Sequence, residues 1–285
     1  MRARGDVDGV ARVIDEASRD RSAFRLSLVV PCYNEAANIR RGVLDTISAL
    51  TADDERFQEV LVVDDGSTDA SRALVTAASQ GRPKFALIEN RHQGKALAVI
   101  TGIQRARSEF VMFSDMDLAT PLGEVEKLIA EAQRGFDIVI GSRQTQRVGA
   151  PFHRKVLARG LLTARDVLLS LDELRDTQCG FKLFRRAVAL DIIQRMRVFT
   201  PTRRALGSSV SAAFDLEFLL IATTLHYRIK EVPVAWRHVE NRSVRVVKDS
   251  FEALADMVKI AYFARTRRYT QPRAVTEADG PPRRP

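Results

Sequence analysis

The chain has 285 residues, of which 45% are hydrophobic and 28% are charged, so it can bury a full core without disulfides or metal staples. No uncharged stretch approaches the roughly 20 apolar residues of a membrane-spanning helix, and no apolar run follows the first residues as in a secretory signal. We therefore expect a cytoplasmic protein. Cys32 and Cys179 belong to no CxxC or Cys/His cluster, which disfavours a disulfide framework, a zinc site or a redox centre.

The net charge of +9 is unevenly distributed. Residues 265–285 hold six arginines against two carboxylates, which accounts for +4 of this excess. Such a tail contacts nucleic acid or an anionic membrane, or it is only a solvated end. We disfavour nucleic acid because the aromatic residues, 7% of the chain, are not interleaved with the basic ones as base stacking requires.

The expected elements begin after residue 24, because residues 1–24 are rich in charge and poor in large apolar groups. Short Val/Ile/Leu-rich runs predict strands at 26–30, 60–63, 85–88, 110–113 and 138–140. Periodic segments between them predict helices at 36–50, 69–80, 94–107 and 121–134. This alternation indicates an open, mostly parallel α/β sheet flanked by helices.

The pattern changes after residue 142. Helical periodicity then marks 153–170, 186–196 and 214–226, and it is followed by a strand at 229–236 and a helix at 249–266. No Gly-, Ser- or Pro-rich linker separates the two halves, so we expect the second to pack on the first. The predicted organisation is a poorly ordered segment at 1–24, a main domain at 25–248 with parts at 25–142 and 143–248, an amphipathic helix at 249–269 and a disordered basic tail at 270–285.

Acidic residues recur where the predicted strands end. In open α/β sheets, ligands bind at the carboxyl ends of the strands. The strand ends of interest are Pro31-Cys32-Tyr33-Asn34-Glu35, Asp64-Asp65-Gly66-Ser67-Thr68-Asp69, Ser114-Asp115-Met116-Asp117 and Gly141-Ser142-Arg143. Carboxylates gathered at one edge are costly unless a cation or a hydrogen-bonding ligand shares the space, so this edge is where we expect the chemistry.

Asp115 and Asp117 predict a site for Mg²⁺ or Mn²⁺. In extended backbone their side chains leave the same face, and their hard oxygens suit ions that keep several waters and bind substrate phosphates. The alternative is a solvated turn with an Asp that caps the next helix. Asp64-Asp65-Gly66-Ser67 is likewise either a carboxylate that faces a nucleobase or ribose, or a tight turn with Gly66 at positive φ.

Gly94-Lys95 opens the third predicted helix, where a cation opposes the helix dipole. The lysine is either held for an anion such as a diphosphate, or it is an exposed side chain. The surrounding sequence is not GxxxxGK[ST], which excludes a P-loop. No GxGxxG follows the first strand either, so a dinucleotide-binding Rossmann site has little support.

Taken in order, these motifs resemble the inverting family 2 glycosyltransferases with the GT-A fold. The second half resembles the polyprenyl-phosphate (dolichyl-phosphate) mannosyl- and glucosyltransferase branch, through Asp176-Thr177-Gln178-Cys179-Gly180-Phe181-Lys182, Phe214-Asp215-Leu216-Glu217 and Glu231-Val232-Pro233-Val234-Ala235-Trp236. The resemblance covers residues 26–248. It implies metal-dependent transfer of glucose or mannose from a UDP- or GDP-hexose to a polyprenyl phosphate, with inversion at the anomeric carbon.

The resemblance also implies roles for single residues. Those implied to line the nucleoside pocket are Pro31, Tyr33, Glu35 and Asp65, with Asp64 holding the turn. Those implied to lie at the ribose, diphosphate and metal are Asp115 and Asp117, with Lys95 close to the phosphates. The lipid phosphate is assigned to Arg143 and to a basic residue of the following helix, here Arg154. Ala158 departs from the pattern, because relatives often have a Ser near the acceptor phosphate, and no spanning helices follow the catalytic part.

Asp117, Asp176 and Arg143 are the expected catalytic residues. A phosphate nucleophile has a second pKa of about 6 and needs no strong base, while the metal and Lys95 stabilise the leaving diphosphate. Asp176 orients the acceptor, or it only pairs with Lys182 or Arg175. The alternative enzyme uses the same donor with a soluble hydroxyl acceptor, such as a sugar or small metabolite, and Asp176 as its base.

The last predicted helix indicates how such a protein reaches a lipid. One side carries Phe251, Leu254, Val258, Ala261 and Tyr262, and Arg265, Arg267 and Arg268 follow at once. The helix either packs on the core with a solvated basic end, or it lies against an anionic membrane surface. We expect peripheral association with the inner face of the membrane, and we leave a homo-oligomer open.

Overall fold

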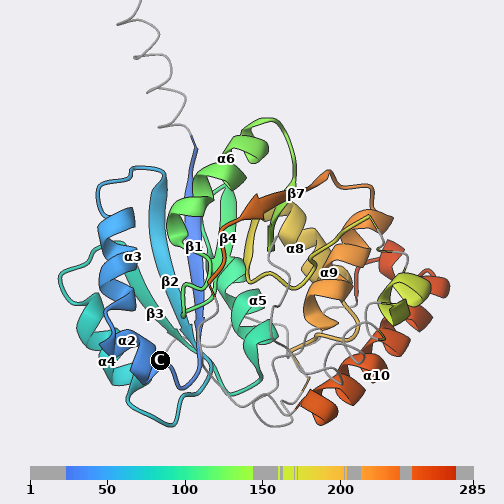
Figure 1. The fold of residues 1–285 in the computed structure, drawn as a ribbon, viewed down its shortest axis with the longest axis horizontal. Helices are drawn as coiled ribbons and strands as arrows, with labels where there is room; N and C mark the ends of the chain where they lie inside the picture. Colours follow the sequence, from blue (N-terminus) through green and yellow to red (C-terminus); the bar gives the residue numbers. More distant parts are fainter. Residues whose placement is uncertain are drawn as a thin grey trace, which may run out of the picture.

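The computed structural model describes residues 24–143, 160, 163–169, 171, 173–201, 203, 213–237 and 246–273. One seven-stranded sheet with helices on both faces organises this part of the chain (Figure 1). The predictions for Arg154, Ala158, residues 1–23 and residues 274–285 lie outside the described residues.

The strands are β1 (Leu26–Cys32), β2 (Phe57–Asp64), β3 (Phe85–Glu89), β4 (Phe110–Ser114), β5 (Ile138–Arg143), β6 (Phe181–Arg185) and β7 (Ile229–Val234). They lie in the order β3-β2-β1-β4-β6-β5-β7. Only β6 runs against its neighbours, with Met112 opposite Leu183 on one side and Val139 opposite Leu183 on the other. The sheet is therefore mostly parallel, as expected, with one antiparallel strand inserted near its centre.

The helices are α2 (Ala36–Arg40), α3 (Val43–Thr51), α4 (Ser71–Ser79), α5 (Lys95–Arg105), α6 (Val125–Gln133), α8 (Arg186–Arg195), α9 (Ala213–Thr224) and α10 (Val246–Arg265), with short 3₁₀ turns η1 (Leu122–Glu124) and η2 (Arg268–Thr270). Residues 163–169 are also helical, within the predicted 153–170 helix. Among the described residues, no helix is both long and apolar enough to cross a membrane.

The central strands are apolar on both faces because each face has its own hydrophobic layer. In β1, Val29 packs in the layer that holds α5, α8 and α9, whereas Leu28 and Val30 pack in the layer that holds α3 and α6. This burial explains why the strands read as continuous apolar runs rather than as alternating ones.

Two local features differ from the sequence-based expectation. The predicted 36–50 helix is broken into α2 and α3 at Gly42, whose φ of +85° is left-handed. β6 was not predicted, and it brings a segment of the second half between β4 and β5 of the first. Strands from both halves therefore share one sheet.

Candidate active site

The candidate site lies at the edge where β1, β2, β4 and β5 end, because these strands all run in the same direction. Side chains from the loops after β1, β2, β3 and β4 lie there, together with side chains from later segments of the chain. Each of the main acidic groups at this edge has a cation or a set of N–H donors beside it, and these contacts offset the repulsion expected from the sequence.

The loops after β1 and β2 are joined by Asn34. Its backbone has a positive φ of 54°, which Asn tolerates better than most residues. The Asn34 side-chain oxygen accepts hydrogen bonds from the backbone N–H of Thr68 at 2.8 Å and of Asp69 at 3.3 Å. In return, the N–H of Asn34 donates to Ser67 Oγ at 3.0 Å. The two loops are thus fixed relative to each other.

The residues predicted to line the nucleoside pocket lie on these joined loops. Pro31 is buried near the end of β1, beside Val63 of β2. Glu35 precedes α2, and its carboxylate accepts from the Asn38 amide at 2.6 Å. The ring of Tyr33 stacks on the ring of His92, with centroids 4.1 Å apart. No role was predicted for His92 from the sequence, although the structure makes it a neighbour of the predicted pocket.

Asp64 and Asp65 are both buried but hold different parts of the site. Asp64 accepts from the N–H of Ser67 at 3.3 Å and pairs with Arg72 at 3.1 Å, so it holds the turn. Asp65 accepts from the backbone N–H groups of Gln93 at 3.0 Å and Gly94 at 2.7 Å.

The Asp65 carboxylate also contacts His92 Nδ1 at 2.8 Å. Burial raises the pKa of Asp65, although the hydrogen bonds from Gln93 and Gly94 act in the opposite direction. Gly66 has a φ of +73°, and a Cβ there would lie 2.9 Å from the backbone nitrogen of His92. The turn after β2 and the loop before α5 therefore fit against each other only with glycine at this position.

Asp115 and Asp117 lie in a turn and not in the extended backbone that we expected. β4 ends at Ser114, and the N–H of Leu118 donates to the Asp115 carbonyl at 3.1 Å. Leu118 has a φ of 47°, a conformation that is rare for leucine. Asp117 accepts from the N–H of Ala119 at 3.0 Å, while Asp115 forms an ion pair with Lys95.

Lys95 begins α5 and projects toward Asp115. Burial disfavours its charged form, but the carboxylates of Asp115, Asp215 and Asp117 prevail, and the pKa of Lys95 is raised. Gly180 lies against this pair, since a Cβ there would be 2.1 Å from Asp115 Oδ2. The motif around Cys179-Gly180 thus leaves room for the Asp115 carboxylate.

A second lysine supports the same region from below the surface. Lys182 on β6 is almost fully buried, and its Nζ donates to the Cys179 carbonyl at 2.5 Å and to Asp215 Oδ1 at 2.8 Å. Asp215 belongs to the first turn of α9. Lys182 and Asp215 lie in two separate motifs of the resemblance, and the fold shows that they form a pair.

Arg143 and Asp176 form a two-pronged ion pair at the end of β5. Arg143 Nε donates to Asp176 Oδ2 at 2.6 Å, and Nη2 donates to Oδ1 at 2.7 Å. Burial favours the protonated acid, but the Arg143 contacts prevail and hold the pKa of Asp176 below its usual range. The partner of Asp176 is therefore Arg143, rather than the Arg175 or Lys182 considered from the sequence.

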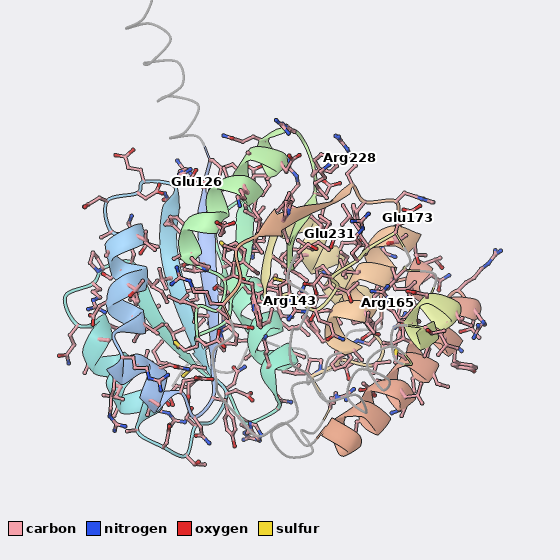
Figure 2. All side chains as sticks on the ribbon, viewed as in Figure 1. Glu126, Arg143, Arg165, Glu173, Arg228 and Glu231 are labelled. Atoms are coloured by element: carbon pink, nitrogen blue, oxygen red, sulfur yellow. The ribbon has the colours of Figure 1, made fainter. Side chains whose placement is uncertain are left out.

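Glu231 on β7 positions this pair. Its two carboxylate oxygens accept from the backbone N–H groups of Arg175 at 3.0 Å and Asp176 at 2.9 Å. Trp236 adds its ring, 5.7 Å from the Arg143 guanidinium. Figure 2 shows Arg143 near the centre of the molecule with Glu231 close by. Glu231 and Trp236 belong to one of the motifs that carry the resemblance, but no role was predicted for either.

Glu217 of α9 has a structural position behind the site. It is fully buried, and it accepts from the backbone N–H groups of residues 197–199 at 2.7 to 2.9 Å and from the Tyr269 hydroxyl at 3.0 Å. Burial raises the pKa of Glu217, and these four donors oppose the rise. One carboxylate thus ties the loop after α8 and the C-terminal turn η2 to the core.

The described residues contain no group of three or more His, Cys, Asp or Glu side chains that could hold a metal ion alone. Asp115 and Asp117 offer two hard carboxylates in one turn, and the Asp115 side chain is about one-third exposed at 36%. This set is too small for a closed protein cage. It fits Mg²⁺ or Mn²⁺ only as part of a coordination shell that waters and substrate phosphates complete.

A seven-stranded, mostly parallel sheet with acidic strand ends and flanking helices is the architecture of the GT-A glycosyltransferases. The chain belongs to glycosyl transferase family 2, and the model of this family matches residues 27–193.

A dolichyl-phosphate beta-glucosyltransferase of Trichomonas vaginalis is 32% identical to it over 257 residues, which cover 86% of this chain and 76% of that protein. A dolichyl-phosphate beta-glucosyltransferase of Drosophila melanogaster is 34% identical over 78% of this chain and 69% of that protein. Among solved structures, glucosyl-3-phosphoglycerate synthase of Mycobacterium tuberculosis in complex with Mn²⁺, UDP and glucosyl-3-phosphoglycerate has a TM-score of 0.64 at 20% identity, over 87% of this chain and 84% of that one.

Proposed function

We propose that this glycosyltransferase moves a glucose residue from a nucleoside diphosphate glucose to a polyprenyl phosphate, with inversion at the anomeric carbon. The observation that carries the proposal is the pair of charged centres at neighbouring strand ends. The Asp115–Lys95 pair lies at the end of β4, and the Arg143–Asp176 pair lies at the end of β5. The relatives named as dolichyl-phosphate glucosyltransferases favour glucose over mannose as the transferred sugar and a polyprenyl phosphate as the acceptor.

On the donor side, we assign the nucleoside to the joined loops around Pro31, Tyr33, Glu35 and Asp65. Lys95 is charged at neutral pH and can donate to diphosphate oxygens. Asp115 and Asp117 would hold Mg²⁺ or Mn²⁺, which supplies positive charge to the departing diphosphate. The structural neighbour that binds UDP and Mn²⁺ makes these the first ligands to test.

On the acceptor side, we assign the lipid phosphate to Arg143, with Arg154 as the second cation. Asp176 takes Nε and Nη2 of Arg143, which leaves Nη1 without a hydrogen bond within the described part of the chain. A phosphate oxygen would attack the anomeric carbon as the bond to the diphosphate breaks. That oxygen is already anionic at neutral pH, so no base has to remove a proton.

The same geometry argues against the hydroxyl-acceptor alternative. A base must accept a proton, but Asp176 binds the Arg143 guanidinium through both oxygens and has a lowered pKa. A carboxylate held in this way is a weak base. Its better role is to orient Arg143 toward an anion, and this role suits a phosphate acceptor.

The place of action follows from the acceptor. A polyprenyl phosphate is anchored in a bilayer, so we propose that the protein works at a membrane surface, on the inner face where nucleotide sugars are available. The donor part would be residues 25–142, and the acceptor part residues 143–248.

The test is a transfer assay with product identification by mass. The protein is incubated with Mg²⁺ or Mn²⁺, with UDP-glucose, UDP-mannose, GDP-glucose or GDP-mannose, and with a short polyprenyl phosphate or a set of soluble sugars. We expect a glucosylated polyprenyl phosphate, and we expect EDTA or Asp117→Asn to abolish its formation without unfolding the protein. Transfer to a soluble hydroxyl alone would overturn the acceptor, and full activity in EDTA would overturn the metal.

A further inference from the structure

The outward face of α10 carries apolar side chains that the core does not cover. Leu254 is 37% exposed, Val258 is 53% exposed and Tyr262 is 61% exposed. Their spacing of four residues places them in one row along the helix. The opposite face is buried in the core through Ala253, Met257, Ile260 and Ala261. A helix that packs only on the core usually has a polar outer face, so this exposed apolar row indicates that α10 binds a second partner.

A basic cluster continues the apolar row. Arg265 ends α10, Arg267 and Arg268 follow directly, and all three are exposed. Apolar side chains, a tyrosine and arginines at one end of a helix are the combination that binds the boundary between lipid tails and anionic headgroups. We call the row and the cluster together the α10 surface, formed by Leu254, Val258, Tyr262, Arg265, Arg267 and Arg268.

The inward face of α10 is connected to the loop before α5, which contains His92 and Gln93. Arg203 Nη2 donates to Asp256 Oδ2 at 2.7 Å, and the Gln93 amide donates to the Pro201 carbonyl at 2.6 Å and to the Arg203 carbonyl at 3.3 Å. Gln93 follows His92 in the loop that Asp65 holds. A contact on the outer face of α10 would therefore hold the catalytic edge of the sheet at a fixed position relative to that contact.

A second copy of the chain is the poorer occupant. A stable protein interface buries about 800 Å² on each partner. Three partly exposed side chains offer far less apolar area than that, and the three arginines would face a like-charged copy. In Figure 1, α10 begins near the lower edge, where β1 and β2 end, and its C-terminal end lies higher, at the right margin of the molecule. A flat surface that contacts α10 along its length would therefore pass beside the edge that carries the site.

We propose that the α10 surface docks on an anionic lipid bilayer and holds the edge of the sheet that carries the site next to the lipid phosphates. The purpose of the contact rests on the proposed function, whereas the contact itself can be tested without any transfer reaction.

The experiment measures co-sedimentation of the full chain with vesicles of neutral phosphatidylcholine, alone or with phosphatidylglycerol. One variant combines Leu254→Ser, Val258→Ser and Tyr262→Ser, and a second combines Arg265→Gln, Arg267→Gln and Arg268→Gln. The charge control combines Arg107→Gln, Arg134→Gln and Arg228→Gln, which removes as many exposed cations from the opposite edge of the sheet. Figure 2 shows Arg228 at the top of the molecule, away from α10. Leu50→Ser, at a leucine 44% exposed on α3, is the apolar control.

We expect the wild type to bind anionic vesicles, to bind neutral ones weakly and to be released by salt. Each arginine near an anionic surface contributes roughly a fivefold change in binding, so the triple arginine variant should bind about 100-fold more weakly. The apolar variant should lose at least about tenfold. Both controls should bind as the wild type does, and all variants should keep the wild-type thermal midpoint.

Two activity measurements separate this proposal from the proposed function. Both α10 variants should keep activity on a water-soluble short-chain polyprenyl phosphate and lose it on a long-chain acceptor in vesicles. Equal vesicle binding by the wild type and both α10 variants would overturn the α10 surface. If analytical ultracentrifugation shows a dimer for the wild type and a monomer for the apolar variant, the surface binds a second copy of the chain instead. Vesicle binding without transfer to either acceptor would refute the proposed function and leave the docking surface standing.

Discussion

Gly180 is the position where one added methyl group tests the donor side most directly. The Cβ of an alanine there would lie 2.1 Å from Oδ2, 2.4 Å from Cγ and 2.7 Å from Oδ1 of Asp115. All three distances are below 3.0 Å, so the whole carboxyl group has to retreat by roughly 1 Å. The backbone cannot give way easily, because the N–H of Asp115 donates to the Gly180 carbonyl at 3.2 Å and Ser114 pairs with Phe181 in the sheet.

The expected loss follows from this displacement. A misplacement of about 1 Å at a reacting group costs on the order of 100-fold in rate, which corresponds to about 2.7 kcal/mol. We expect Gly180→Ala to lower kcat/KM for the nucleotide sugar by about that factor and to weaken donor binding measured by calorimetry with Mn²⁺. Acceptor KM should change much less, because the three atoms nearest to the added Cβ all belong to Asp115 and none to Arg143 or Asp176.

Gly123→Ala is the matched control. A Cβ at Gly123 meets nothing within 4 Å, so this variant should be at least as stable as the wild type and should match it in kcat/KM. If Gly180→Ala folds with the wild-type thermal midpoint and keeps full donor affinity and turnover, Asp115 has no part in donor binding and the assignment of the donor side fails.

Two further predictions concern stability. Glu217→Gln should lower the free energy of unfolding by roughly 2–4 kcal/mol in urea titration, because an amide nitrogen would face the N–H donors of residues 197–199. Tyr269→Phe, which removes only one donor to Glu217, should lower it by about 1 kcal/mol. Equal losses for the two variants would show that the backbone donors contribute nothing beyond the tyrosine. Because Arg143 lowers the pKa of Asp176, their pair stabilises the fold above the unfolded-state pKa of about 4 and this contribution is lost as pH falls through the lower folded-state pKa. Asp176→Asn should therefore be less stable at pH 7 and show a smaller loss between about pH 5 and pH 3, and an unchanged slope would show that the pair is not formed in solution.

The apolar strands and the motifs at their ends could be predicted because their signal is local. β6 could not, because Lys182 and Arg185 interrupt its short apolar run and α8 follows without a turn. Its pairing partners, β4 and β5, are distant in sequence, and no local pattern indicates an antiparallel strand between them. The sheet expected from the sequence was therefore correct in class but lacked one member.

The contacts within the site were less predictable than the residues that form it. Asp115 and Asp117 were expected in extended backbone, but Leu118 adopts a positive φ that propensity does not predict. Asp176 had two basic residues near it in sequence, yet its partner is Arg143, which the sheet brings from the end of β5. Pairing of side chains across strands depends on register, and register is a property of the whole sheet.

The insertion of β6 between β4 and β5 has a geometric consequence for the reaction. Neighbouring strands are about 4.8 Å apart, so the ends of β4 and β5 are held about 9.6 Å from each other across the sheet. If the donor and acceptor centres lie at these two ends, backbone hydrogen bonds act as a ruler that sets the gap in which the sugar ring has to fit. Loops can lengthen or shorten during evolution, but this gap can change only in steps of a whole strand. A relative that transfers a larger group would have to make room above the sheet, not within it.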